Sequence, residues 1–216
     1  VVEFCEKKGI RLHGHTLTWG NGTWQYPRWL LAKLPKEILV QMLTDTRNGT
    51  NIMTKSAAEI EKLLPDFVDE LNKQMERRIR VIAEHYGDRI MSWDIVNESA
   101  TDFGLGNQVP GANFCKSVYG FMPGDYTYRS FQVSDDAFPK NVQLNINDYN
   151  LGQCYPDQVN DLLSRGCRID IMGHRCTCSI RKRAWILLTA RVRFSRLLLS
   201  VKPWNGLGKL VCPFIS

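Results

Sequence analysis

The last fifth of the chain contains no acidic residue. Residues 174–216 include no Asp or Glu, although they include nine Lys or Arg. All 22 acidic residues lie in residues 1–173 with the other 19 basic residues (28 − 9), so this body has a net charge of −3 and the tail +9. A segment without acids cannot supply a catalytic carboxylate, so carboxylate chemistry has to come from residues 1–173.

The tail also lacks a long uninterrupted apolar run. A transmembrane helix needs about 20 consecutive apolar residues, and Arg191, Arg193 and Arg196 interrupt the tail too often for that. Basic arms that bind nucleic acid or anionic lipid are usually polar, whereas this one is rich in Leu, Ile, Val, Phe and Trp. Its apolar residues follow neither a helical nor an alternating period. We therefore expect no membrane or nucleic-acid partner, and an irregular segment without a native fold over residues 174–216.

Regular cysteine spacing is absent as well. The seven cysteines are odd in number and unevenly placed, which argues for mostly free thiols rather than a disulfide framework. His174, Cys176 and Cys178 lie close together, but a C-x-C pair lacks the second pair of ligands that a zinc site needs. We expect no metal site.

The body, residues 1–173, alternates helical and strand patterns. Helices are predicted over residues 1–8, 56–86 with a break at Pro65, 126–138 and 158–164. Strands are predicted over 90–96, 142–147 and 167–172, and a long loop rich in Gly, Asn and Pro over 101–124. Strands that alternate with helices imply a parallel sheet with right-handed crossovers, so the fold class is α/β in one domain.

Two short segments have the composition of a substrate site. Residues 93–98 read Trp-Asp-Ile-Val-Asn-Glu, an apolar strand that ends in Asn97 and Glu98. Enzymes with parallel sheets place their chemistry at the carboxyl ends of strands, where a Glu can act as a proton donor. Taken alone, this segment is more typical of an ordinary strand end with a solvated Glu than of a catalytic site.

The other segment, residues 11–19, also reads as a short strand, and it leads into a group of aromatic residues. Four rings, those of Trp19, Trp24, Tyr26 and Trp29, fall within eleven residues. Aromatic planes suit the apolar C–H faces of sugar rings. The alternative is that two or three of these rings belong to the core.

Together the segments resemble glycoside hydrolase family 10, the endo-1,4-β-xylanases. That family has R-G-H-x-L-x-W, then P-x-W, W-D-x-x-N-E and N-D-Y-N motifs. Matching residues occur here in the same order, at 14–19, 27–29, 93–98 and 147–150. The family usually has a second His after the Trp of the first motif, where this chain has Gly20. The resemblance covers roughly residues 1–173.

The resemblance implies a (β/α)8 TIM barrel, of which this chain is expected to hold roughly strands three to six. It implies retaining hydrolysis of β-1,4-xylan, with Glu98 as acid/base and no cofactor. Asn97 would bind the 2-hydroxyl of the sugar and His15 would orient the site. The other candidate substrate-binding residues are Trp24, Trp29, Asn147 and Tyr149.

A change of reading frame accounts for the tail. The family's sixth strand has a Q-x-H pattern, and codons for Ser-Gln-Met-His-Leu-Phe read one base later encode the six residues of 174–179. We therefore hypothesise that everything after Gly173 is translated out of frame, which the DNA sequence of the source would test.

The family's nucleophile is a Glu in a T-E-x-D strand, and no acid follows Asp170 in this chain. We therefore expect a chain truncated at both ends that has little or no xylanase activity. Asp148 is a substitute candidate, although a structural role suits it better. The alternative function is a non-hydrolytic carbohydrate-binding remnant that uses Trp24 and Trp29.

An incomplete barrel exposes strand edges, which predicts a monomer that aggregates in isolation. The polymeric substrate of the family implies a secreted or periplasmic parent enzyme.

Overall fold

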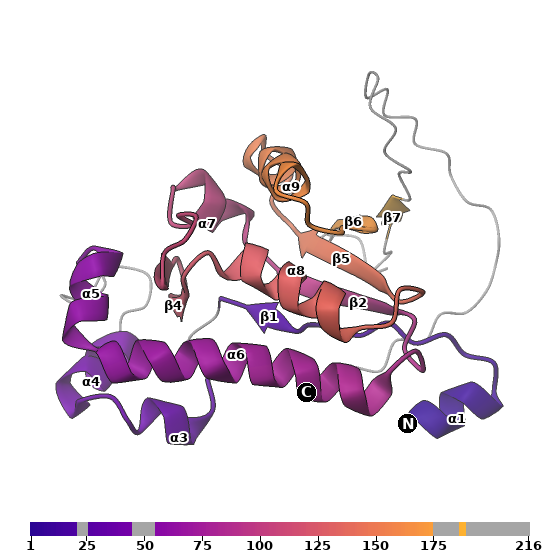
Figure 1. Cartoon of the computed structure of the whole chain (residues 1–216), viewed down its shortest axis with the longest axis horizontal. Helices are drawn as coiled ribbons and strands as arrows, with labels where there is room; N and C mark the ends of the chain where they lie inside the picture. The colour runs from indigo at the N-terminus through magenta and orange to yellow at the C-terminus, as the bar shows by residue number, and fades with distance from the viewer. Residues whose placement is uncertain (21–25, 45–54, 175–185, 189–216) are drawn as a thin grey trace.

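The structure is a computed structural model of the chain, and it describes residues 1–20, 26–44, 55–174 and 186–188 (Figure 1). Its main sheet has the strand order β1-β2-β5-β6-β7. The first four strands are parallel neighbours, and β7 pairs antiparallel with β6. Their bounds are Thr18–Trp19, Ser92–Asn97, Gln143–Asp148, Ile171–His174 and, for β7, Ile186–Leu188.

Helices connect the parallel strands. α6 leads from the N-terminal part of the chain into β2, α8 into β5, and α9 into β6. This alternation confirms the α/β prediction and is the repeating unit of a (β/α)8 barrel. The helices are α1 (Val2–Lys7), α3 (Arg28–Leu31), α4 (Lys36–Thr44), α5 (Ala57–Leu63), α6 (Pro65–Tyr86), α7 (Ala100–Gly104), α8 (Tyr126–Ala137) and α9 (Cys154–Ser164).

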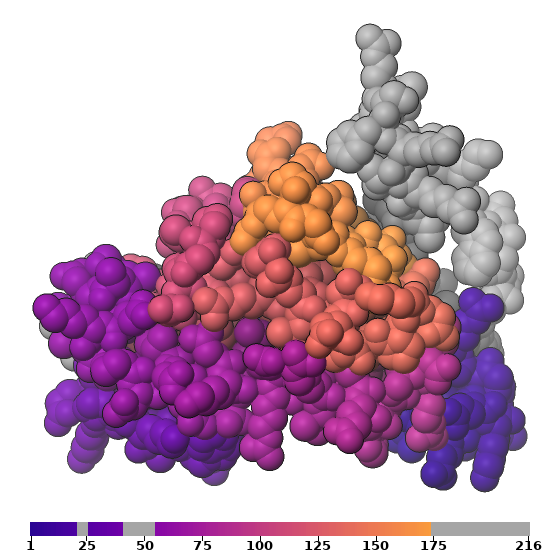
Figure 2. Space-filling view, viewed as in Figure 1, coloured from indigo at the N-terminus to yellow at the C-terminus, as the bar shows by residue number. Residues whose placement is uncertain are grey.

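The break predicted at Pro65 is present because Pro is compatible with the first turn of a helix but not with its interior. α5 starts at a capping box in which Ser56 and Glu59 satisfy each other's backbone N–H groups. α6 then begins at Pro65 and buries one face along its length. α8 lies in front of the sheet and α6 runs beside α8 along its lower edge (Figure 1). In the space-filling view the atoms of the two helices adjoin (Figure 2).

Aromatic rings fill the space between these helices and the sheet. Trp93 of β2 lies between the rings of Tyr86 and Phe138, with ring centroids 5.7 Å and 5.9 Å away. Phe121 packs against Phe67 and Phe114 in the same way at the other end of α6. Burial of the Trp93 ring holds the ends of the helices on the main sheet, and burial of Phe121 holds the other end of α6 on the segment over residues 114–123.

The prediction of a loop over residues 101–124 is wrong. This stretch contains α7 and an antiparallel hairpin, β3 (Phe114–Ser117) with β4 (Gly120–Pro123). Phe114, Cys115 and Phe121 are almost completely buried, and that burial stabilises the hairpin. Its strands are only four residues long, too short to produce a clear alternating pattern among the Gly, Asn and Pro residues.

Other bounds differ from the predictions. The strand expected over residues 11–19 is reduced to Thr18–Trp19 plus one bridge between Gly14 and Trp93. α9 begins at Cys154 rather than 158, β6 begins at Ile171 rather than 167, and α3 and α4 were not predicted. β6 ends at His174, and β7 falls within the tail, in an antiparallel orientation that barrel strands do not have. Among the helices of the described ranges, none is long and apolar enough to cross a membrane.

Candidate active site

Glu98 lies at the carboxyl end of β2, where the chain leaves the sheet. Its backbone N–H donates to the carbonyl oxygen of Asn147 at 2.8 Å, so it continues the pairing of β2 with β5. Its φ of 56° falls in the left-handed region that residues other than Gly rarely adopt. The indole Nε1 of Trp19 donates to Glu98 Oε2 at 3.1 Å. The Glu98 carboxylate is thus held against Trp19 at the end of the neighbouring strand β1.

Asn97 and Asn147 face each other across β2 and β5. The two residues are register partners, and Asn147 Nδ2 donates to Asn97 Oδ1 at 2.8 Å. Both side chains are buried. Within the described part of the chain, Asn97 Nδ2 has no hydrogen-bond partner. Leaving such a buried donor unpaired costs about 1–3 kcal/mol.

His15 is oriented by a buried carboxylate that the sequence-based reasoning missed. Its Nδ1 lies 2.8 Å from Asp94 Oδ2, and His13 Nε2 lies 3.1 Å from Asp94 Oδ1. Burial tends to raise the pKa of Asp94, but the hydrogen bonds from His13 and His15 together outweigh it and hold that pKa below its usual value. Asp94 is therefore ionised and locks the ring orientation of His15.

Replacing Asp94 with Asn is expected to lower the free energy of unfolding at pH 7 by about 1–3 kcal/mol. The asparagine amide keeps only one acceptor oxygen for the two histidines, and the negative charge that both histidines contact is lost. The pKa of Asp94 is lower in the folded chain than its unfolded value near 3.8. Its stabilising contribution is therefore complete above about pH 4 and is lost as the pH falls through the folded pKa. The difference in the free energy of unfolding between wild type and Asp94→Asn, measured by urea titration, should therefore become smaller below pH 4.

A matched control for this experiment is Asp69→Asn, which removes an exposed carboxylate 2.6 Å from Lys73 Nζ. Surface pairs of this kind contribute about 0–1 kcal/mol. Equal losses of stability in the two variants would contradict the role given to Asp94. So would a stability difference between wild type and Asp94→Asn that grows below pH 4.

The aromatic candidates divide into three groups. Tyr149 follows β5, is about half exposed, and places its hydroxyl 3.2 Å from the hydroxyl of Tyr119. Trp29 on α3 is also about half exposed, and Lys33 Nζ lies 5.6 Å from its ring centroid. Tyr26 is a buried core residue whose ring packs against Phe67, whereas Trp24 lies outside the described residues.

Gly20 directly follows Trp19 and lies against the β3–β4 hairpin. A Cβ at this position would come within 2.5 Å of Ser117 Oγ. That hydroxyl donates to the buried carboxylate of Asp102 at 2.6 Å. A side chain such as the His of the related motif therefore cannot occupy this position while Ser117 keeps its place.

Asp148 has a structural role, as the sequence favoured. One oxygen accepts the backbone N–H of Ala100 at 2.9 Å, and the other accepts that of Asn150 at 2.7 Å. Burial raises the pKa of Asp148, and these backbone hydrogen bonds offset part of the increase. The two oxygens thus hold backbone N–H groups at the start of α7 and directly after β5.

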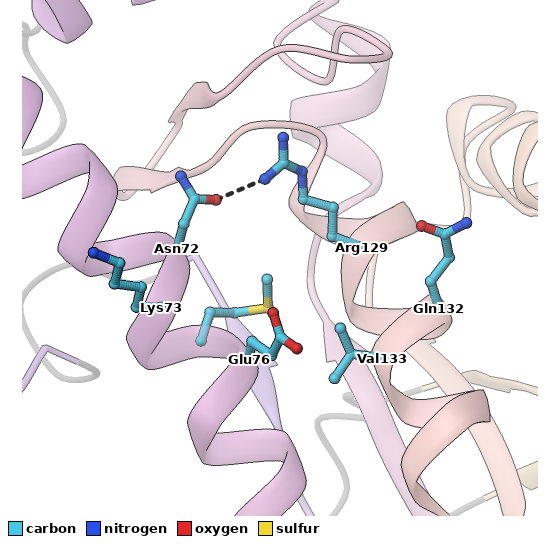
Figure 3. Close-up of a pocket in the computed structure, with 7 residues that line it drawn as sticks. Asn72, Lys73, Glu76, Arg129, Gln132 and Val133 are labelled. Carbon is cyan, nitrogen blue, oxygen red and sulfur yellow. Dashed lines mark hydrogen bonds between the residues drawn. The ribbon is translucent and has the colours of Figure 1, made fainter.

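No group of three or more His, Cys, Asp or Glu side chains within the described ranges is placed to hold a metal ion. A hollow of about 330 Å³ lies between α6 and α8, lined in part by Asn72, Glu76 and Arg129 (Figure 3). Arg129 Nη1 donates to Asn72 Oδ1 there at 2.9 Å. This hollow lies in the helix layer rather than at the carboxyl end of β2.

Comparison with known proteins identifies the family of this chain. The family described as "Glycosyl hydrolase family 10" matches residues 1–193. The chain belongs to this family. Because members form a (β/α)8 barrel, the four parallel strands described here are part of such a barrel. The match extends 20 residues beyond Gly173 (193 − 173), and the altered reading frame of the tail stays a prediction.

Two relatives show how much of a family member is present. A thermostable celloxylanase of Thermoclostridium stercorarium is 25% identical over 96% of this chain and 46% of its own length. Endo-1,4-beta-xylanase A of Halalkalibacterium halodurans is 28% identical over 81% of this chain and 39% of its own length. The chain therefore spans less than half the length of these relatives.

Solved structures support the same fold. Xylanase B from Clostridium stercorarium F9 has a TM-score of 0.53 and is 26% identical, with 80% of this chain and 45% of that one covered. Xylanase 10B from Thermotoga petrophila RKU-1, solved in complex with xylobiose, has a TM-score of 0.51 and is 22% identical, with 81% and 42% covered.

Proposed function

We propose that this chain forms the acid/base side of a family 10 endo-1,4-β-xylanase site, with Glu98 as the proton donor. The observation that supports this most directly is the Glu98 carboxylate at the carboxyl end of β2, 3.1 Å from Trp19 Nε1. Asn97 precedes it in the chain, and its buried Nδ2–H, which has no partner among the described residues, is the donor that the family relationship assigns to the sugar 2-hydroxyl. His15, held by Asp94, and Tyr149 are further substrate-binding candidates, together with Asn147, Trp24 and Trp29.

Retaining hydrolysis needs a second carboxyl group about 5–5.5 Å from the first, to attack the anomeric carbon. No acidic residue follows Asp170 in this sequence. Asp94 is bound to His13 and His15, and Asp148 to backbone N–H groups. We therefore propose that the 216-residue chain binds xylo-oligosaccharides but hydrolyses xylan very slowly or not at all.

Two measurements on the purified chain test this proposal. Release of reducing sugar from xylan should stay at the level of a Glu98→Gln control, because the covalent step lacks its nucleophile. Titration with xylotriose, followed by tryptophan fluorescence, should show saturable binding that Trp19→Ala weakens. Robust hydrolysis that Glu98→Gln abolishes would show that a nucleophile is present. Absence of any binding at millimolar xylotriose would refute the proposed site.

A second candidate, non-hydrolytic carbohydrate binding through the Trp24 and Trp29 platform, is favoured by the exposure of the Trp29 ring. The same titration separates the two functions. If Trp29→Ala abolishes xylotriose binding while Trp19→Ala and Glu98→Gln leave it unchanged, the platform rather than the Glu98 site is the binding surface.

A further inference from the structure

We propose that Tyr119, at the turn of the β3–β4 hairpin, is a substrate-binding residue that forms an aromatic wall with Tyr149 beside Glu98. The inference rests on the proposed function. It assigns a sugar-binding role to a hairpin that the sequence motifs do not include. The ligand is a β-1,4-linked xylo-oligosaccharide whose pyranose ring lies next to the bond that Glu98 would protonate.

The hairpin turn is held in one position by a buried carboxylate. Asp102 accepts hydrogen bonds from Ser117 Oγ at 2.6 Å, from the backbone N–H of Val118 at 2.6 Å and from the Tyr126 hydroxyl at 2.7 Å. The backbone N–H of Tyr119 donates in turn to Ser117 Oγ at 3.3 Å. Tyr119 therefore follows two residues that are tied to α7 and α8, which lowers the entropy its ring would lose on binding.

The Tyr119 side chain is directed toward the end of the sheet that carries the candidate site. Its hydroxyl lies 3.2 Å from that of Tyr149, which directly follows β5. The backbone around Tyr149 is fixed because Asp148 holds the N–H groups of Ala100 and Asn150. Two phenol rings from separate loops thus meet above the carboxyl ends of adjacent strands β2 and β5.

Tyr119 also lies close enough to Glu98 for its phenol to respond to that carboxylate. Burial raises the pKa of Tyr119, and the hydrogen bond with Tyr149 and the charges of Glu98 and Asp102 raise it further. The phenol therefore stays neutral and protonated over the range in which carboxylate catalysis operates. A neutral tyrosine offers an apolar face to the C–H groups of a sugar and a hydroxyl to its oxygens.

The test is xylotriose titration of the full chain, with tryptophan fluorescence as the readout. Tyr119→Ala is expected to raise the Kd about tenfold, because the ring face and the hydroxyl are both lost. Tyr119→Phe keeps the face and should raise it no more than about threefold. Leu105→Ala, an exposed position in the same connection between β2 and α8, is the matched control and should leave the Kd unchanged.

A structural role for Tyr119 is separated from a binding role by urea unfolding of each variant. The proposal expects the large loss of affinity in Tyr119→Ala to occur with an unfolding midpoint close to that of Tyr119→Phe. If wild type binds, Trp19→Ala binds poorly and Tyr119→Ala binds like wild type, the inference is wrong and the proposed function stands. If Tyr119→Phe loses as much affinity as Tyr119→Ala, the aromatic face is not the binding element. If wild type itself does not bind, both proposals fail.

Discussion

Replacing Arg165 with Met is expected to lower the free energy of unfolding by about 3–5 kcal/mol, the range seen when one partner of a buried ion pair is removed. The Arg165 guanidinium binds the carboxylate of Asp125, which is almost completely buried at the start of α8. The same guanidinium stacks 3.8 Å from the Tyr128 ring centroid and lies 3.2 Å from Asp161 on α9. Methionine keeps much of the apolar stem but leaves the Asp125 charge without a counter-ion.

Urea unfolding followed by circular dichroism measures this loss, and Arg80→Met provides the control. Arg80 pairs with Glu76 and Asp136 on the surface, where all three side chains are largely exposed. Exposed pairs contribute about 0–1 kcal/mol, so the two substitutions should differ by at least about 2 kcal/mol. Similar losses in both would mean that Asp125 finds another partner or that water reaches it.

Replacing Gly14 with Ala should destabilise the chain by about 3 kcal/mol or more, the upper range for overpacking in a core. Gly14 donates to the carbonyl of Ser92 and accepts from the N–H of Asp94, each at 2.8 Å, so it lies flat against β2. A Cβ there would approach the Trp93 ring to between 2.1 and 2.5 Å. The Trp93 ring cannot move away from the added methyl group because it is packed between Tyr86 and Phe138.

The control for Gly14 is Gly9→Ala. Gly9 has a φ of 64° and nothing within 4 Å of an added Cβ, so only the left-handed backbone costs energy there, about 1–2 kcal/mol. In a Trp93→Leu background, the penalty of Gly14→Ala should shrink because the smaller side chain removes the clash. An unchanged penalty in that background would show that the Trp93 ring is not its cause. Because Gly14 lies between His13 and His15, the substitution should also weaken xylotriose binding.

The sequence by itself determined the features that depend on local order. The apolar run before Asn97 and Glu98 predicted a strand that delivers both residues to its carboxyl end, and β2 does so. Pro65 divided α5 from α6, because the ring of proline excludes it from a helix interior. The alternation of strands and helices was sufficient to predict a parallel sheet, because right-handed crossovers leave few ways to connect such elements.

Only the tertiary structure decided which side chains meet at the candidate site. Trp19 reaches Glu98 and His15 reaches Asp94 across 79 residues of chain, and Tyr119 reaches Tyr149 across 30. Periodicity reports the conformation of a segment, whereas these contacts depend on how strands align and how a buried Asp102 holds the hairpin turn. Packing of segments distant in sequence selects those neighbours. Asp94 and Tyr119 therefore could not be assigned to the candidate site before the fold was known, and neither could the contact between Trp19 and Glu98.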